Sequence, residues 1–163
     1  KRQVVSGLQG ISDSLESIRN YDTEDTLVVG VGSVASCRRA VDDTINYVKE
    51  RKAFGKRIAD FQNTQFKLAE LSTEVEIGRV FVDKLCASHV EGEDIVTEVS
   101  GAKYWTTDLQ KKVTAECLQL HGGYGFMKEY PIAMDYADAA VQSIYAGTNE
   151  IMKVIISRRL GLG

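Results

Sequence analysis

The chain has 163 residues, of which 44% are hydrophobic and 26% charged, with a single proline. This composition is typical of a folded, helix-rich domain and argues against a disordered or fibrous chain. Its 20 Lys and Arg residues and 23 Asp and Glu residues give a formal charge of −3, without a long basic run. We therefore expect no generic binding to nucleic acid or to an anionic membrane, and no apolar run reaches the roughly 20 residues of a membrane span.

The cysteines and histidines do not indicate a metal site or a disulfide framework. Cys37, Cys86 and Cys117 are an odd number without a C-x-x-C pair, which predicts reduced thiols in a bacterial cytoplasm or a mitochondrial matrix. His89 and His121 lie far apart in the sequence, and His121 has no neighbouring cysteine or close carboxylate pair, so we expect no metal ligands.

Three long segments carry apolar residues at intervals of three and four, the spacing of an amphipathic helix. They predict helices over residues 27–52, 61–89 and 102–120. Glycines at or just beyond the ends of these segments are typical helix stops: Gly55, Gly92 and Gly122.

A fourth helix is predicted to begin near Thr148, whose side chain is suited to an N-cap. The segment 122–140, which contains Pro131, is expected to be the longest irregular stretch. Long helices with short connections predict an all-α fold, an antiparallel up-and-down four-helix bundle. We assign residues 26–163 to this bundle and residues 1–25 to an N-terminal lead-in segment.

Three segments could carry chemistry, although each alone can be explained as a helix end. Residues 119–126 place three glycines just after a helix, where a ligand can approach the backbone. Residues 144–151 lead into a helix N-terminus, which favours an anion. Residues 51–56 gather cationic and aromatic side chains at a helix end.

In this order and at these separations, the three segments resemble the C-terminal domain of the acyl-CoA dehydrogenases, over about residues 26–160. The likeness is densest in the long-chain and isovaleryl-type branch. Its supporting runs are YVKERKAFGK at 47–56, FQ at 61–62, KLAE at 67–70, AKYW at 102–105, QLHGGYGF at 119–126, EYPI at 129–132 and YAGTNEIM at 145–152.

The resemblance implies a flavoprotein that binds FAD and converts an acyl-CoA thioester to the trans-2-enoyl-CoA. Family members have three domains, of which this chain would be the last, so we expect it to be part of a longer protein and inactive alone. The C-terminal bundle of the family forms a dimer or a dimer of dimers. Electron-transfer flavoprotein is the expected electron acceptor.

The resemblance also assigns residues to the cofactor. Arg51 matches an arginine that approaches the FAD diphosphate of a neighbouring subunit, a sensible partner for a guanidinium. The remaining positions would line the adenosine half of that FAD (Phe54, Gln62, Gln119 and Gly123) or contact FAD from the other side of the subunit interface (Thr148 and Glu150).

The catalytic base is the clearest departure from the family pattern. Most members carry a glutamate just before the Gly-Thr of the last loop, where this chain has Ala146. The long-chain and isovaleryl-type enzymes place the base on the first helix of the domain, at a position that an ungapped count assigns to Asp25. Glu24 is the rival, and a chain without a base is a third possibility. The backbone N–H of Ala146 can still donate to the thioester carbonyl.

Two other functions are consistent with the sequence. A catalytically silent subunit could contribute to the FAD site of a partner, because Ala146 cannot accept a proton. A helical oligomerisation domain could contribute to a partner's FAD site in the same way. From a different class, a helical interaction bundle without a cofactor would fit the composition alone.

Overall fold

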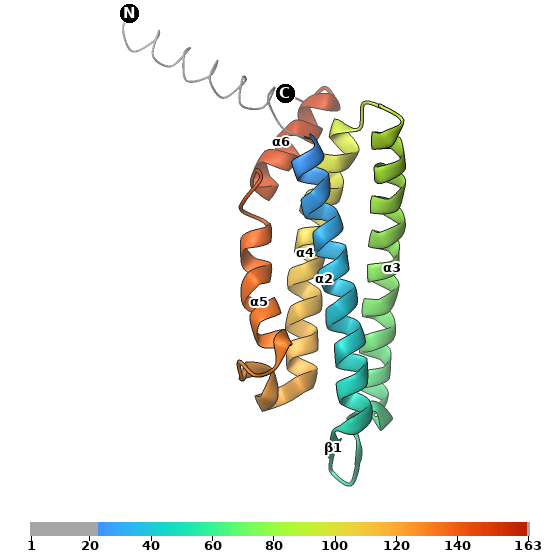
Figure 1. The fold of residues 1–163 in the computed structure, drawn as a ribbon, viewed down its shortest axis with the longest axis vertical. Helices are drawn as coiled ribbons and strands as arrows, with labels where there is room; N and C mark the ends of the chain where they lie inside the picture. Colours follow the sequence, from blue (N-terminus) through green and yellow to red (C-terminus); the bar gives the residue numbers. More distant parts are fainter. Residues whose placement is uncertain (1–22, 163) are drawn as a thin grey trace, which may run out of the picture.

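The computed structural model describes residues 23–162 and contains five α-helices within them (Figure 1). The helices are α2 (Thr23–Glu50), α3 (Gln62–Val90), α4 (Val96–His121), α5 (Pro131–Gln142) and α6 (Asn149–Arg159). A two-stranded hairpin, β1 (Lys52–Ala53) and β2 (Lys56–Arg57), and two short 3₁₀ helices, η1 (Ile58–Asp60) and η2 (Gly122–Phe126), join them. The lead-in segment expected before the bundle lies outside the described residues except for its last three, which open α2.

The helices form an antiparallel bundle whose fourth position is shared by two helices. Successive long helices α2, α3 and α4 alternate in direction, and the shorter α5 and α6 follow one another along the remaining side (Figure 1). The all-α, up-and-down bundle predicted from the sequence is confirmed. Among the described helices, none combines the length and apolar character needed to cross a membrane.

The core follows the apolar spacing and is centred on α4, which packs against α2, α3, α5 and α6. One buried cluster lies toward the hairpin end and includes Cys37, Leu71 and Val113, whereas a second near the start of α2 includes Leu27 and Val99. Burial raises the pKa of the Cys37 thiol to about 12, so this cysteine is inert packing rather than a nucleophile.

The prediction of an irregular segment over residues 122–140 is wrong for most of that range. Its first residues form η2, and Pro131 opens α5 at the first helical turn, a position that proline favours because no N–H is needed there. Only Ile132 and Ala139 of α5 are buried. Exposed apolar residues on the other faces of α5 remove the clear three-four spacing that identified the longer helices.

The hairpin between α2 and α3 is a second feature that the sequence did not predict. Lys52 pairs with Arg57 and Ala53 with Lys56, which leaves Phe54 and Gly55 as the two turn residues. Both have positive φ, 52° and 81°, as the tightest hairpin turns require. A phenylalanine in this conformation is strained, whereas glycine is not.

Two helix glycines differ in the space around them and give a matched test of the packing. A Cβ at Gly78 would lie 3.2 Å from Trp105 and 3.3 Å from Val34, whereas one at Gly101 would meet nothing within 4 Å. Gly101→Ala should gain up to about 1 kcal/mol of helix propensity, while crowding at Gly78 costs about 1–3 kcal/mol. We expect a lower free energy of unfolding for Gly78→Ala than for Gly101→Ala in urea titrations. Equal stability of the two variants would contradict this packing.

Candidate functional site

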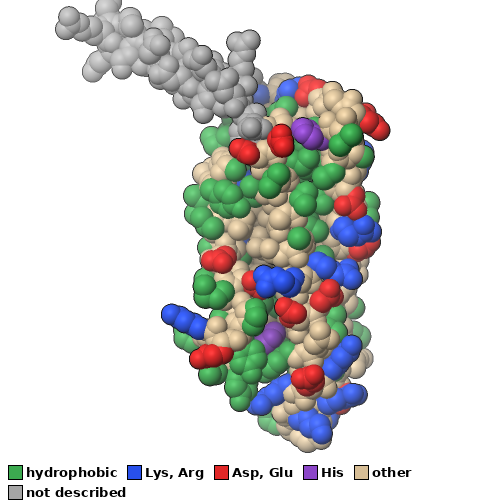
Figure 2. Space-filling model, in the orientation of Figure 1, with side chains coloured by type: hydrophobic (Ala, Val, Ile, Leu, Met, Phe, Trp, Pro, Cys, Tyr) green, Lys and Arg blue, Asp and Glu red, His purple; other side chains and the backbone are tan. Residues whose placement is uncertain are grey.

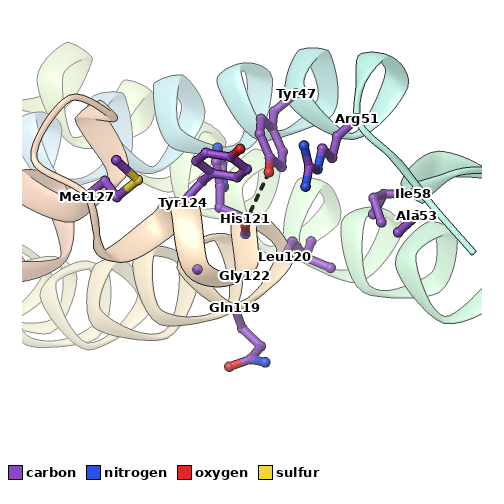
Figure 3. A pocket seen from close by; sticks show the side chains of 11 residues that line it. Tyr47, Arg51, Ala53, Ile58, Gln119, Leu120, His121, Gly122, Tyr124 and Met127 are labelled. Atoms are coloured by element: carbon purple, nitrogen blue, oxygen red, sulfur yellow. Dashed lines mark hydrogen bonds between the residues drawn. The ribbon is translucent and has the colours of Figure 1, made fainter.

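A cavity of about 510 Å³ lies where α2 and α4 end, close to the hairpin (Figure 3). Three of the residues predicted to bind the cofactor, Arg51, Gln119 and Gly123, line it together. The other lining residues are Tyr47, Ala53, Ile58, Leu120, His121, Gly122, Tyr124 and Met127. Because α2 and α4 run in the same direction, their C-terminal ends bring residues from distant parts of the chain to one place.

An aromatic cluster fixes the back of this cavity. The Tyr47 ring stacks on His121 with centroids 4.1 Å apart, and its hydroxyl donates to the His121 carbonyl at 3.1 Å. His121 Nδ1 lies 2.8 Å from the Cys117 carbonyl, and the Tyr130 ring meets both other rings edge-on. These contacts tie the last turn of α4 to α2, so the glycines that follow start from a defined position.

Arg51 and the glycine backbone form the open side of the cavity. The Arg51 guanidinium lies over the Tyr124 ring, 4.7 Å from its centroid, a cation–π contact that holds the charge beside the cavity (Figure 3). Gly122 and Gly123 are exposed, and a Cβ at either would meet nothing within 4 Å. The Gln119 amide points away from Arg51 and Tyr124 (Figure 3). A guanidinium beside accessible backbone suits a phosphate-bearing ligand.

Phe54 and Gln62 lie beside this cavity without lining it. Phe54 is 95% exposed at the hairpin tip, where its ring meets Phe61 edge-on. The Lys56 ammonium lies 4.1 Å from the centroid of the same Phe61 ring. Gln62 is exposed at the first residue of α3. Both side chains are thus accessible to a ligand or to another chain beyond the hairpin.

A second cavity, of about 480 Å³, brings Asp25 and Ala146 together near the start of α2. Asp25 lies in the first turn of α2, and Ala146 in the α5–α6 loop, which we define as residues 143–148. The remaining lining residues are Val28, Val29, Gly32, Ser36, Gln142 and Tyr145. Glu24, the rival base, does not line this cavity. A carboxylate and a loop backbone thus border one cavity with an apolar wall.

Thr148 and Glu150 lie at the N-terminus of α6, in a smaller cavity of about 230 Å³. The Thr148 hydroxyl accepts from the Ile151 N–H at 3.4 Å, which confirms the predicted N-cap. The backbone N–H of Glu150 and then the Thr148 hydroxyl lower the pKa of the Glu150 carboxyl, which stays ionised. Lys111 and Lys153 line the same cavity, and their positive charges also lower the pKa of the Glu150 carboxyl.

Sequence reasoning missed the buried polar group beneath the α5–α6 loop. Lys103 is fully buried in α4, and its ammonium donates to the Gly147 carbonyl at 2.6 Å. Asn149 is buried beside it. Lys103 stands next to the apolar residues of the predicted helix, and nothing in its spacing distinguishes it from an exposed lysine. Among the described residues no cluster of His, Cys, Asp and Glu could hold a metal ion.

Residues 24–161 match the family model described as the acyl-CoA dehydrogenase, C-terminal domain. The long-chain specific acyl-CoA dehydrogenase of Mus musculus mitochondria is 47% identical over 137 residues, 84% of this chain but 32% of that protein. The caffeyl-CoA reductase–Etf complex subunit CarC of Acetobacterium woodii is 37% identical, over 82% of this chain and 35% of that protein.

The fold is similar to that of a solved acyl-CoA dehydrogenase from Geobacillus kaustophilus. The TM-score is 0.83 at 51% identity, and the match covers 85% of this chain and 36% of the solved one. The chain spans about a third of the length of the proteins it matches.

Gly125 and Gly123 lie in the same glycine-rich segment but differ in the space around them, so they give a matched test of the packing beside the first cavity. A Cβ at Gly125 would lie 2.5 Å from the Leu118 carbonyl oxygen, so the backbone must shift, whereas one at Gly123 meets nothing within 4 Å. We expect Gly125→Ala to destabilise the fold by about 1–3 kcal/mol and Gly123→Ala to change stability by less than about 0.5 kcal/mol. Thermal unfolding of both variants tests this, and equal melting temperatures would contradict the tight contact.

Proposed function

Because the chain belongs to the acyl-CoA dehydrogenase family and supplies its C-terminal domain, we propose that it acts within an FAD-dependent enzyme that oxidises an acyl-CoA to the trans-2-enoyl-CoA. The single observation that carries this proposal is the meeting of Arg51, Gln119 and Gly123 at one cavity of matching chemistry. These residues belong to segments 51–56 and 119–126, which the sequence singled out independently.

The first cavity would hold the diphosphate end of FAD. Arg51 offers a forked guanidinium whose charge-assisted hydrogen bonds suit a diphosphate. Gly123 lets the ligand approach the backbone without a side chain in the way. The exposed Phe54 and Gln62 would extend the contact toward the adenosine half, although the Gln119 amide must turn toward the cavity to join them.

The residues assigned to FAD divide between two places, which supports an oligomeric site. Arg51 and Phe54 lie at the hairpin end, whereas Thr148 and Glu150 lie at the start of α6 in a separate cavity. One FAD held between two copies of the chain would use both sets. Exposed apolar side chains along the α5 side of the bundle support such packing (Figure 2): Met134, Tyr136, Val141 and Ile144. We infer a dimer or a dimer of dimers.

The second cavity would hold the reacting end of the acyl-CoA. The Asp25 carboxylate would accept the α-proton, while the Ala146 N–H would donate to the thioester carbonyl as negative charge develops on it. Bound FAD supplies the acceptor for the β-hydrogen, which leaves with its electron pair as hydride. Both residues line one cavity, with Val28 and Val29 forming an apolar wall suited to an acyl chain.

The electrons would pass onward to a second flavoprotein. The relative from Acetobacterium woodii is named as a subunit of a complex with Etf, which supports electron-transfer flavoprotein as the partner. The mouse relative is mitochondrial. We infer that the protein works in a mitochondrial matrix or a bacterial cytoplasm.

A silent subunit is the second candidate, and two features of the sequence favour it. Ala146 occupies the place of the loop glutamate found in most of the family, and aspartate at position 25 has a shorter side chain than the glutamate of the long-chain type. Such a subunit would use Arg51 and Gly123 to complete the FAD site of a partner without oxidising substrate itself.

Removing the Arg51 charge tests the cofactor site. In the full-length protein we expect Arg51→Met to weaken FAD binding by about 10- to 100-fold, the worth of one charge-assisted contact. Arg38→Met is the matched control, because Arg38 is an exposed arginine of α2, the helix that ends just before Arg51, and it pairs with Asp42. Titration of the flavin absorbance measures both affinities. Equal affinity of the two variants would reject the diphosphate role.

Replacing each of the two neighbouring carboxylates by its amide tests which one is the catalytic base. Asp25→Asn should lower kcat of the full-length enzyme by about 100-fold or more, because an amide cannot accept the α-proton. Glu24→Gln, the matched control, should stay within about threefold of the native rate. The reverse pattern would assign the base to Glu24. A loss of less than tenfold in both variants would favour a base outside this chain.

A further inference from the structure

Lys103 is a charged side chain with no exposed surface in the described structure. Its ammonium reaches out of α4 to the α5–α6 loop and to the first residue of α6, and it donates to the Gly147 carbonyl at 2.6 Å and to Asn149 Oδ1 at 3.1 Å. We propose that Lys103 is a positioning residue that holds the loop backbone, and with it the Ala146 N–H, in place for the thioester. The catalytic part of this inference rests on the proposed function.

The loop needs an external anchor because its own conformation is unfavourable. Ala146 has φ of 50° and Gly147 φ of 85°. A non-glycine residue in the left-handed region is strained and persists only where its surroundings impose that conformation. Within the loop, the Asn149 N–H donates to the Ser143 carbonyl at 3.1 Å and closes the turn. Lys103 then attaches the turn to α4, because its ammonium binds the carbonyl of Gly147, the residue after Ala146.

Asn149 is a second attachment between the start of α6 and α4, beside the Lys103 contact. Its side-chain amide donates to Thr107 Oγ1 at 3.0 Å, to the Tyr104 carbonyl at 3.2 Å and to Asp108 Oδ1 at 3.1 Å. Lys103 and Asn149 are both buried. Within residues 23–162, the acceptors of the Lys103 ammonium lie on the loop and on the residue that follows it.

Energetics favour a positioning role over a stabilising one. Burial lowers the pKa of Lys103, which reflects the desolvation of its charge, while Asp108 and Glu150 partly offset this effect. Replacing Lys103 leaves the Gly147 carbonyl without this donor, so the penalty of an unpaired acceptor falls on the loop rather than on the helix contacts. Methionine has a similar length and fills irregular gaps. Lys103→Met should therefore keep the bundle and release the loop.

The first measurement is amide hydrogen exchange of the full-length protein. We expect Lys103→Met to speed the exchange of peptides covering residues 143–149 by about 10- to 100-fold, with α2 and α3 unchanged. Lys112→Met is the matched control, because Lys112 lies on the same helix but pairs with the exposed side of α3 through Glu74 at 2.6 Å. Native loop exchange in a folded Lys103→Met protein would overturn the proposal.

A kinetic measurement separates positioning of the amide from anchoring of the loop. Lys103→Met should lower kcat by about tenfold or more with a smaller change in KM, because the Ala146 N–H acts on charge that develops during the reaction. Faster loop exchange with native kcat would overturn the catalytic part. An inactive native protein would reject the proposed function, while the exchange comparison would still test the anchor. If Lys103→Met does not fold, Lys103→Leu, which also lacks an N–H donor, gives the same comparison.

Discussion

The burial of α4 is the constraint on which the other features depend. This helix packs against α2, α3, α5 and α6, so its two ends and its middle have fixed neighbours. Its last residue, His121, stacks on Tyr47 of α2 and places the glycines that follow. Its N-terminal half presents Lys103 to the α5–α6 loop. One buried helix thus positions both candidate regions of the chain.

The long helices could be predicted because their burial follows local spacing. Leu71, Val75 and Val82 repeat at the intervals that a buried helix face requires, and Gly92 and Gly122 end helices with positive φ as expected. The short α5 could not be recognised, since apolar residues such as Met134, Tyr136 and Val141 lie on its exposed faces as well as on its buried one. The hairpin escaped prediction because it places a phenylalanine in a conformation that glycine or asparagine normally adopts.

The candidate site also contains residues that local sequence identifies and residues that only the folded structure reveals. Arg51, Gln119 and Gly123 could be assigned because short segments of the sequence resemble the acyl-CoA dehydrogenases, a likeness that local sequence alone reveals. Their supports could not, since the Tyr47 hydroxyl and its acceptor on His121 are 74 residues apart in sequence. Lys103 was invisible for the same reason, because only the folded structure shows that its acceptors lie on the loop before α6.

Both regions share one physical device, a strained residue held by a contact from outside its own turn. Phe54 and Ala146 are the non-glycine residues of the described chain with positive φ. Phe61 contacts the Phe54 ring, and Lys103 holds the carbonyl of the residue after Ala146. Without the outside contact, each turn would relax toward less strained conformations. A strained turn with one anchor has a single conformation that the anchor selects, which is the property that precise binding of a ligand requires.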